Sequence, residues 1–329
     1  MGSSQVALSE QVQVFLRKYG QSGFQVAKTA VLVDKIVSKP IREILCYFME
    51  ETWLNIQHPA LIALACQAVG GRPDAPNQVS AAIVLLTGAA DIHDDIIDKS
   101  KTKASKPTPY GKFSQDAVLL AGDALLFKGL MHLHKACDEF SVEKKQVVLG
   151  LVQDAFFEIG NATANERTLK GKHAVEPEKY RKIIEAKGAV SDACARIGAV
   201  IGEGAPEEID VLGHFGRTLG ILMGVKYDFV DLFNPAELQN RAKNEVLPLP
   251  LLYALQDTAA KKQVETLLKG RLTKQKTRKI ADLALKTNQV QILKKEMLTM
   301  ARNEANLLKT IKGNTSELKL LLKLSIEHF

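Results

Sequence analysis

The residues that stand out as candidates for chemistry are four aspartates at the end of a long apolar run. The segment DIHDDIIDKS (91–100) follows VSAAIVLLTGAA (79–90) and carries Asp91, Asp94, Asp95 and Asp98, here called the first acidic stripe. On a helix, Asp94 and Asp98 lie one turn apart on one face, and carboxylates are costly to bury without a partner charge. Mg²⁺ binds one or two carboxylates and completes its shell with water and phosphate oxygens. The pattern therefore predicts a magnesium site that also holds phosphate.

A second pair of aspartates lies on another apolar segment, far downstream. TLGILMGVKYDFVDLF (218–233) carries Asp228 and Asp231 at i, i+3 spacing, here called the second acidic stripe. If folding brings the two stripes together, two facing helices could clamp a metal-bound diphosphate between them. The alternative for each stripe is a solvated acidic face, which the surrounding apolar residues disfavour. The predicted metal ligands are Asp94, Asp95, Asp98, Asp228 and Asp231.

The elements that must position these carboxylates are helices. Of the 329 residues, 46% are hydrophobic and 25% are charged, which is ample for a large core. Apolar residues recur with helical spacing, as in DAVLLAGDALLFKGLMHLHKA (116–136), and turn signals such as EGAPEE (203–208) and NPAEL (234–238) separate the helices. We therefore expect an all-α class, with one bundle of antiparallel helices forming a single domain over 1–329 and basic helices over 261–329.

Composition and charge exclude several other classes. No charge-free apolar run of about 18 residues occurs, so no transmembrane segment is expected, and the first residues lack the pattern of a secretory signal. The four cysteines are widely spaced without a C-x-x-C pair, which is typical of reduced thiols in a cytoplasmic protein. The net charge of +7 favours anionic partners. No motif with stacking aromatics accompanies the basic segments, so nucleic acid is not an expected partner.

Several segments together resemble the trans-isoprenyl diphosphate synthase, or polyprenyl synthetase, family. HDDIID (93–98) is similar to the family's D-D-x-x-D motif, and KPTPYGKFSQDAVLLAGDALL (106–126) to the end of its Arg-Arg-Gly-Lys-Pro loop and its L-A-G-D-x-L-L helix. The similarity continues through YRKIIEAKGAVSDACARIGAVIG (180–202) and LPLPLLYAL (247–255), and covers roughly residues 40–260. It implies the isoprenoid synthase fold, a helical bundle around a deep apolar pocket, usually dimeric.

The resemblance also implies a reaction. In the family, Mg²⁺ ions held by the acidic motifs stabilise the diphosphate that leaves an allylic prenyl diphosphate. The allylic carbocation forms in a dry pocket, where the double bond of isopentenyl diphosphate attacks it and the chain grows by one isoprene unit.

Residues at positions that match the family's motifs are expected to have the same roles as in the family. The implied catalytic residues are Asp94, Asp95, Asp98 and Lys187. The implied ligands of the substrate diphosphate are Lys103, Lys106, Lys187 and Arg241. Two small residues before the first motif, Ala89 and Ala90, are expected to leave room for a long prenyl chain, with close helix packing as the alternative.

The chain departs from the family where isopentenyl diphosphate would bind. The family's Gly-Lys-Arg-x-Arg-Pro segment aligns with LNIQHP (54–59), so that Asn55, Ile56 and His58 replace three cations. Further replacements are Thr87 for a His, Ala104 for the loop's second Arg, and Tyr227 for the first Asp of the second motif. Charge-assisted hydrogen bonds contribute roughly 1.5–3 kcal/mol each. Binding of a second diphosphate should therefore be weaker by several such contributions.

Three interpretations remain open at this point. The chain could be a prenyltransferase that uses isopentenyl diphosphate or another acceptor through an atypical site. It could be a class I terpene synthase-like enzyme that needs one diphosphate substrate, although Tyr227 and Pro235 do not match that class's second motif. It could also be a non-catalytic or regulatory subunit, acting as a heteromer with a homologous subunit rather than as the homodimer expected from the family.

Overall fold

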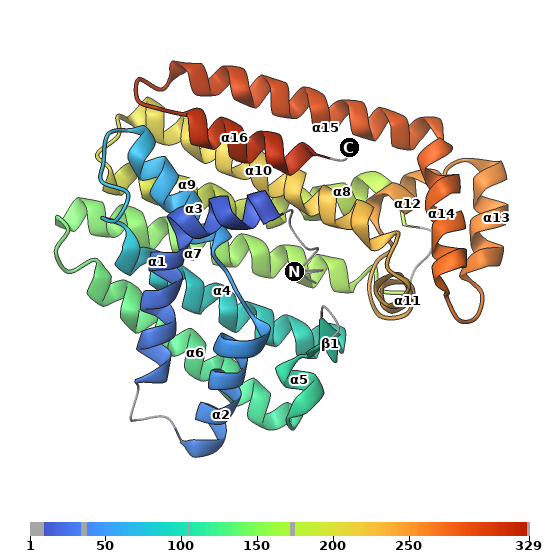
Figure 1. The fold of residues 1–329 in the computed structure, drawn as a ribbon, viewed down its shortest axis with the longest axis horizontal. Helices are drawn as coiled ribbons and strands as arrows, with labels where there is room; N and C mark the ends of the chain where they lie inside the picture. Colours follow the sequence, from blue (N-terminus) through green and yellow to red (C-terminus); the bar gives the residue numbers. More distant parts are fainter. Residues whose placement is uncertain (1–9, 34–37, 104–105, 172–174, 328–329) are drawn as a thin grey trace. The chain divides into compact units, whose positions relative to one another are not determined.

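The computed structural model describes residues 10–33, 38–103, 106–171 and 175–327. Over these ranges the regular structure is helical, apart from one antiparallel hairpin with two residues in each strand (Figure 1). The prediction of an all-α class is confirmed.

The chain forms two compact units, each assembled from segments that are distant in the sequence. The first unit comprises Met1–Asp154, Ala193–Gly216 and Lys309–Leu318, and the second comprises Ala155–Asp192, Arg217–Leu308 and Lys319–Phe329. The expectation of a single domain over 1–329 stays a prediction.

The elements that lie wholly in the first unit come from the N-terminal part of the chain. They are α1 (Glu10–Leu32), α2 (Lys39–Tyr47), the π-helical turn η1 (Phe48–Thr52), α3 (Gln57–Ala68), α4 (Asn77–Asp98), β1 (Thr102–Lys103), β2 (Lys106–Pro107), α5 (Pro109–Lys112) and α6 (Gln115–Ala136). Five elements contribute residues to both units: α7 (Val142–Arg167), α9 (Ala189–Ile201), α10 (Pro206–Asp231), η2 (Leu308–Thr310) and α16 (Ser316–Ile326).

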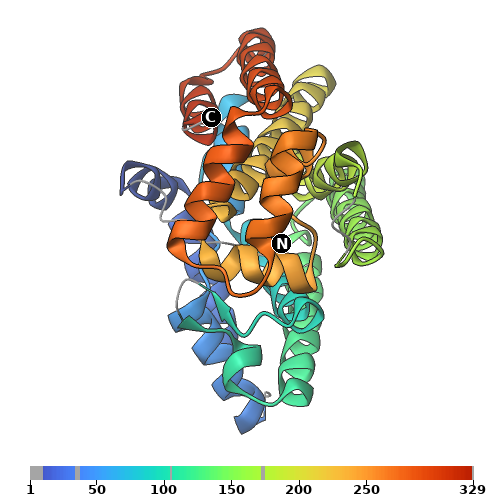
Figure 2. The same cartoon turned by 90° about the vertical axis from the view of Figure 1, so that its right-hand side faces the viewer.

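The second unit holds the remaining helices. They are α8 (Pro177–Lys187), α11 (Pro235–Asn244), α12 (Leu249–Ala254), α13 (Thr258–Leu268), α14 (Lys274–Lys286) and α15 (Asn288–Leu307). Helix α12 packs on α8, α14 and α15, and the two orange helices α13 and α14 lie side by side (Figure 2). The segment NPAEL, expected as a turn, opens α11, because Asn234 Oδ1 accepts hydrogen bonds from the N–H groups of Ala236 and Glu237.

Helix α4 is the buried helix that carries the first acidic stripe. It packs on α1, α3 and α6, and two glycines let α6 approach it closely. A Cβ at Gly122 would lie 2.5 Å from His93 Nε2, and one at Gly129 would lie 2.8 Å from Leu86 Cδ2. The helix ends where Lys99 adopts the left-handed conformation, with φ 58° and ψ 34°. The first acidic stripe therefore occupies the last two turns of α4.

Helix α6 has the length and hydropathy of a membrane-spanning helix, although core helices of globular proteins can have the same composition. The expectation of no transmembrane segment therefore stays a prediction. Only 33% of the most apolar 18-residue stretch of α6 is buried. The exposed apolar side chains include Leu120, Phe127 and Met131, at 55%, 70% and 61% exposure.

Candidate functional site

The first acidic stripe is buried although it consists of carboxylates. Asp91 and Asp94 are each 9% exposed, Asp95 is 2% exposed, and Asp98 is half-buried. All four lie near the C-terminal end of α4, where the helix dipole places partial negative charge. This position is unfavourable for anions, so the stripe needs a cation close by.

Lys103 supplies one such cation. It lies on β1 of the hairpin that follows α4, and its Nζ is 3.0 Å from Asp91 Oδ1 and 2.8 Å from Asp95 Oδ1. Burial raises the pKa of Asp95 to about 7, although Lys103 opposes that shift. Lys103, expected to bind the substrate diphosphate, thus already contacts two carboxylates of the stripe.

The side chain of Lys106, the second basic residue of the hairpin, contacts the turn η1. Its Nζ donates a hydrogen bond to the backbone carbonyl of Glu51, in the π-helical turn η1, at 2.9 Å. Lys106 is exposed, so its ammonium can exchange that contact for an anionic ligand. The predicted departure at Ala104 lies outside the described residues.

The donor set of the first stripe suits Mg²⁺ bound together with phosphate. Asp95 Oδ1 is buried, and the Lys103 ammonium lies 2.8 Å from it. In the described part of the chain, no three His, Cys, Asp or Glu side chains form a ready-made metal cluster. Mg²⁺ commonly uses one or two carboxylates plus substrate phosphates.

The second acidic stripe differs from the first, because an arginine contacts both of its carboxylates. Asp228 and Asp231 are buried at the end of α10. The Nη1 atom of Arg241, from α11, donates to Asp228 Oδ1 at 2.6 Å and to Asp231 Oδ2 at 2.7 Å. The other oxygen of Asp228 accepts a hydrogen bond from the Leu249 N–H at 2.7 Å. Three of the four carboxylate oxygens of this stripe thus accept hydrogen bonds from the protein's own donors, and the role of Asp228 and Asp231 as metal ligands stays a prediction.

Lys187, at the end of α8, is also engaged by a carboxylate. It forms an ion pair with Glu166 of α7, and both side chains are largely buried. Although burial opposes the shift, Lys187 lowers the pKa of Glu166. The sequence prediction placed Lys187 on the substrate diphosphate and gave no role to Glu166, whose only signal was an acidic residue within an amphipathic helix.

The structure thus assembles the predicted residues into separate groups. Asp91 and Asp95 meet Lys103 in the first unit, and Asp228 and Asp231 meet Arg241 in the second. The facing of the two acidic stripes stays a prediction.

The segment aligned with the isopentenyl diphosphate site forms an uncharged hydrogen-bonded group. Asn55 Nδ2 donates to Thr87 Oγ1 at 3.0 Å and lies 2.7 Å from His58 Nδ1. We call Asn55, His58 and Thr87 the neutral cluster. Burial lowers the pKa of His58 to about 4, so the imidazole is uncharged at neutral pH. Ile56, which lies between Asn55 and His58 in the sequence, is buried.

The two small residues expected to line a chain-length pocket differ in burial. Ala89 is fully buried and Ala90 is half-buried. A Cβ at the neighbouring Gly88 would lie 3.1 Å from Trp53 and 3.2 Å from Phe48, whose rings stack 4.9 Å apart. Close packing accounts for the glycine, and the roles of Ala89 and Ala90 in chain length stay predictions.

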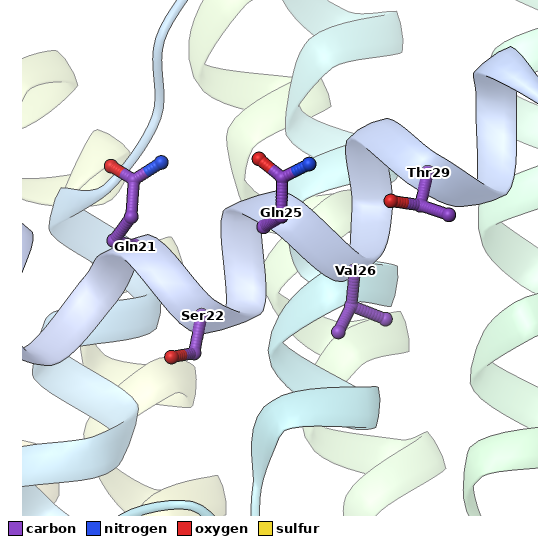
Figure 3. Close-up of a pocket in the computed structure, with 5 residues that line it drawn as sticks. All are labelled: Gln21, Ser22, Gln25, Val26 and Thr29. Atoms are coloured by element: carbon purple, nitrogen blue, oxygen red, sulfur yellow. The ribbon is translucent and has the colours of Figure 1, made fainter.

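A shallow pocket on α1 does not belong to this chemistry. Gln21, Ser22, Gln25, Val26 and Thr29 line it along one helix (Figure 3). None of these side chains carries charge, so the pocket offers no strong contact for a diphosphate.

Comparisons with known proteins agree with the resemblance in the sequence. The family model described as Polyprenyl synthetase matches residues 55–285. A short chain isoprenyl diphosphate synthase of Methanothermobacter thermautotrophicus is 31% identical over 180 residues, 54% of each chain. The large subunit 1 of a heterodimeric geranylgeranyl pyrophosphate synthase of Arabidopsis thaliana is 29% identical over 210 residues, 59% of this chain and 55% of that one. The chain thus spans about half the length of the curated relatives it matches.

Solved structures are similar over nearly the whole chain. The geranylgeranyl pyrophosphate synthetase of Pyrococcus horikoshii superposes with a TM-score of 0.83 at 22% identity, covering 97% of this chain and all of the other. The geranylgeranyl pyrophosphate synthetase of Geoglobus acetivorans gives a TM-score of 0.82 at 16% identity, covering 95% and 99%. At such identities the likeness concerns the fold alone, and the predicted isoprenoid synthase fold is confirmed.

Proposed function

The chain belongs to the polyprenyl synthetase family, and from this premise we propose that it is a Mg²⁺-dependent prenyltransferase acting on an allylic prenyl diphosphate. The observation that carries the proposal is the first acidic stripe, with its buried carboxylates and with Lys103 beside Asp91 and Asp95. Buried carboxylates gathered on the last two turns of α4 are the oxygen ligands that a divalent cation bound with phosphate uses.

Within this proposal, Asp94, Asp95 and Asp98 hold Mg²⁺, and Lys103 orients two carboxylates of the stripe. Bound Mg²⁺ stabilises the diphosphate that leaves the allylic substrate. Lys106 is the basic residue of the hairpin best placed to exchange its backbone contact for the substrate diphosphate. Lys187 and Arg241 are not assigned to the diphosphate, because each is paired with carboxylates of the chain.

We propose that the acceptor is bound without the cationic residues that the family uses for a second diphosphate. The neutral cluster places an amide, an uncharged imidazole and a hydroxyl where two cations and a histidine are expected from the resemblance. These groups satisfy one another and offer no positive charge to a second diphosphate. The acceptor is therefore isopentenyl diphosphate bound through other residues, or a different nucleophile.

The proposal is tested by incubating the full chain with Mg²⁺ and farnesyl or geranylgeranyl diphosphate, with and without isopentenyl diphosphate, and identifying products by mass. Prenyl diphosphates lengthened only when isopentenyl diphosphate is present would establish an elongating transferase. Release of inorganic diphosphate without it would indicate another acceptor or a terpene synthase-like reaction. Asp94→Ala should abolish either activity, whereas Asp282→Ala, on an exposed position of α14, should not. A chain inactive under both conditions would contradict the proposal.

A second candidate function, a subunit of a heteromeric prenyl diphosphate synthase, is favoured by the exposed apolar face of α6. Leu120, Phe127 and Met131 recur at helical spacing and are mostly exposed, which is typical of a surface that another chain covers. One relative carries the name of a heterodimeric synthase's large subunit. A change in the product length or rate of an active homologue on mixing with the full chain would support this function. Absence of both complex formation and rate change would exclude it.

A further inference from the structure

The second acidic stripe has its own cation. We infer that Arg241 takes the place of a divalent metal there, so that Asp228 and Asp231 form a structural clasp and contribute no metal ligand. The inference concerns the geometry of this stripe, and it stands whether or not the chain transfers prenyl groups.

The hydrogen bonds around the guanidinium leave little room for a metal. Arg241 Nη1 contacts both carboxylates, Nη2 donates to the Tyr180 hydroxyl at 2.7 Å, and Nε donates to the Val246 carbonyl at 2.9 Å. Both oxygens of Asp228 are used, one by Arg241 and one by the Leu249 N–H. A divalent ion would have to displace a donor from Asp228 and then lie beside a buried positive charge.

Arg241 cannot leave the stripe as an exposed arginine could. Its side chain is only 7% exposed, against 6% for Asp228 and 1% for Asp231. Its partners lie on α8, on α10 and in the segment that leads from α11 into α12. Removing one member of such a buried group leaves an uncompensated charge, which is strongly destabilising. The guanidinium therefore acts as a fixed counter-ion that ties these segments together.

The clasp separates the two acidic stripes by function. In the first stripe, Lys103 contacts Asp91 and Asp95 from a hairpin strand. In the second stripe, a buried guanidinium contacts both carboxylates, and both oxygens of Asp228 accept from donors of the chain. Metal binding by this chain should therefore depend on Asp94 and be insensitive to Asp228.

The test is Mn²⁺ binding to the full chain, followed by electron paramagnetic resonance of free Mn²⁺, with inorganic pyrophosphate present. We expect Asp94→Asn to raise the Kd by about tenfold or more, and Asp228→Asn to leave it within about twofold. A tenfold weakening in Asp228→Asn, with the fold intact by circular dichroism, would overturn the clasp. Wild-type protein that binds no Mn²⁺ would agree with the clasp but contradict the proposed function, so the two failures are distinguishable.

A second measurement addresses the arginine itself. Arg241→Gln should lower the melting temperature by about 5 °C or more, and Mn²⁺ should raise the melting temperature of that variant more than that of the wild type. Arg278→Gln, on an exposed position of α14, is the matched control and should change neither value. A melting temperature of Arg241→Gln equal to that of the wild type would overturn the inference. If the variant does not fold, the Mn²⁺ comparison of Asp94→Asn and Asp228→Asn decides.

Discussion

At the scale of single residues, His58 illustrates how a position aligned with a cation has become uncharged. Its Nδ1 lies 2.7 Å from the Asn55 amide nitrogen, which is a donor, so the ring nitrogen must accept. A protonated imidazole would place two donors against each other. Together with burial, this geometry favours the neutral ring.

We expect the stability of the protein to fall as His58 is forced to take up a proton. Burial lowers its pKa in the folded chain to about 4 from the ordinary 6.5. Below pH 6.5 the unfolded chain is protonated first, so the free energy of unfolding should decrease between pH 6.5 and 4, by up to about 3 kcal/mol. Urea unfolding across this range measures the effect. His58→Gln should remove that part of the slope, and His214→Gln, at an exposed position, should keep it.

Asp95 carries a prediction that rests on a pKa shift in the opposite direction. Burial raises its pKa to about 7, so part of the carboxyl is protonated at neutral pH, and a metal must displace that proton. Mn²⁺ affinity in the presence of pyrophosphate should therefore increase by about threefold to tenfold between pH 6 and 8. The same titration of Asp95→Asn should be less steep, because only pyrophosphate still titrates in this range. A wild-type profile no steeper than that of Asp95→Asn would show that Asp95 does not take part in binding.

At the scale of elements, the sequence indicated which helices carry carboxylates but not what faces them. Spacing within a segment is enough to place Asp94 and Asp98, or Asp228 and Asp231, on one side of a helix. The partner of the second stripe, Arg241, lies ten positions after Asp231, beyond the reach of helical periodicity and on a separate helix. The same holds for Glu166 and Lys187. Which cation balances a buried carboxylate is decided by tertiary packing, which periodicity does not encode.

The packing of α6 on α4 gives a prediction at this scale. Gly129→Ala would bring a Cβ within 2.8 Å of the Leu86 side chain and 3.1 Å of its backbone nitrogen. Such overpacking should lower the free energy of unfolding by about 1–3 kcal/mol. Gly150→Ala is the control, because a Cβ on that part of α7 meets nothing within 4 Å. This control should be neutral or stabilising, by up to about 1 kcal/mol. Equal stabilities of the two variants in urea would contradict the packing.

At the scale of the whole molecule, composition predicted a helical fold, and the family resemblance predicted its type. The outer face of α6 was not predicted, because an apolar residue on a mostly apolar helix looks the same in sequence whether it is buried or exposed. In the first unit, Leu120, Phe127 and Met131 remain accessible. Their exposure makes association with another chain a property that can be measured directly.

We expect the purified chain to form a dimer at about 10 µM, since an exposed apolar face of this kind is typical of an interface. Phe127→Lys should shift it to the monomer in sedimentation velocity experiments, because a charge in the centre of the face cannot be desolvated cheaply. Val14→Lys, at a similarly exposed position of α1, should leave the mass unchanged. A monomeric wild type at this concentration would leave a different subunit as the expected partner.

The neutral cluster also bears on how this chain could change in evolution. Replacing Asn55 with lysine alone would remove the donor shared by His58 and Thr87, and would bring an ammonium beside a buried, uncharged imidazole. A first step toward a cationic patch would thus lose stability before any phosphate contact is gained. The substitutions that restore such a patch are favourable only in combination. Such sign epistasis would hinder the stepwise appearance of a cationic patch at this position.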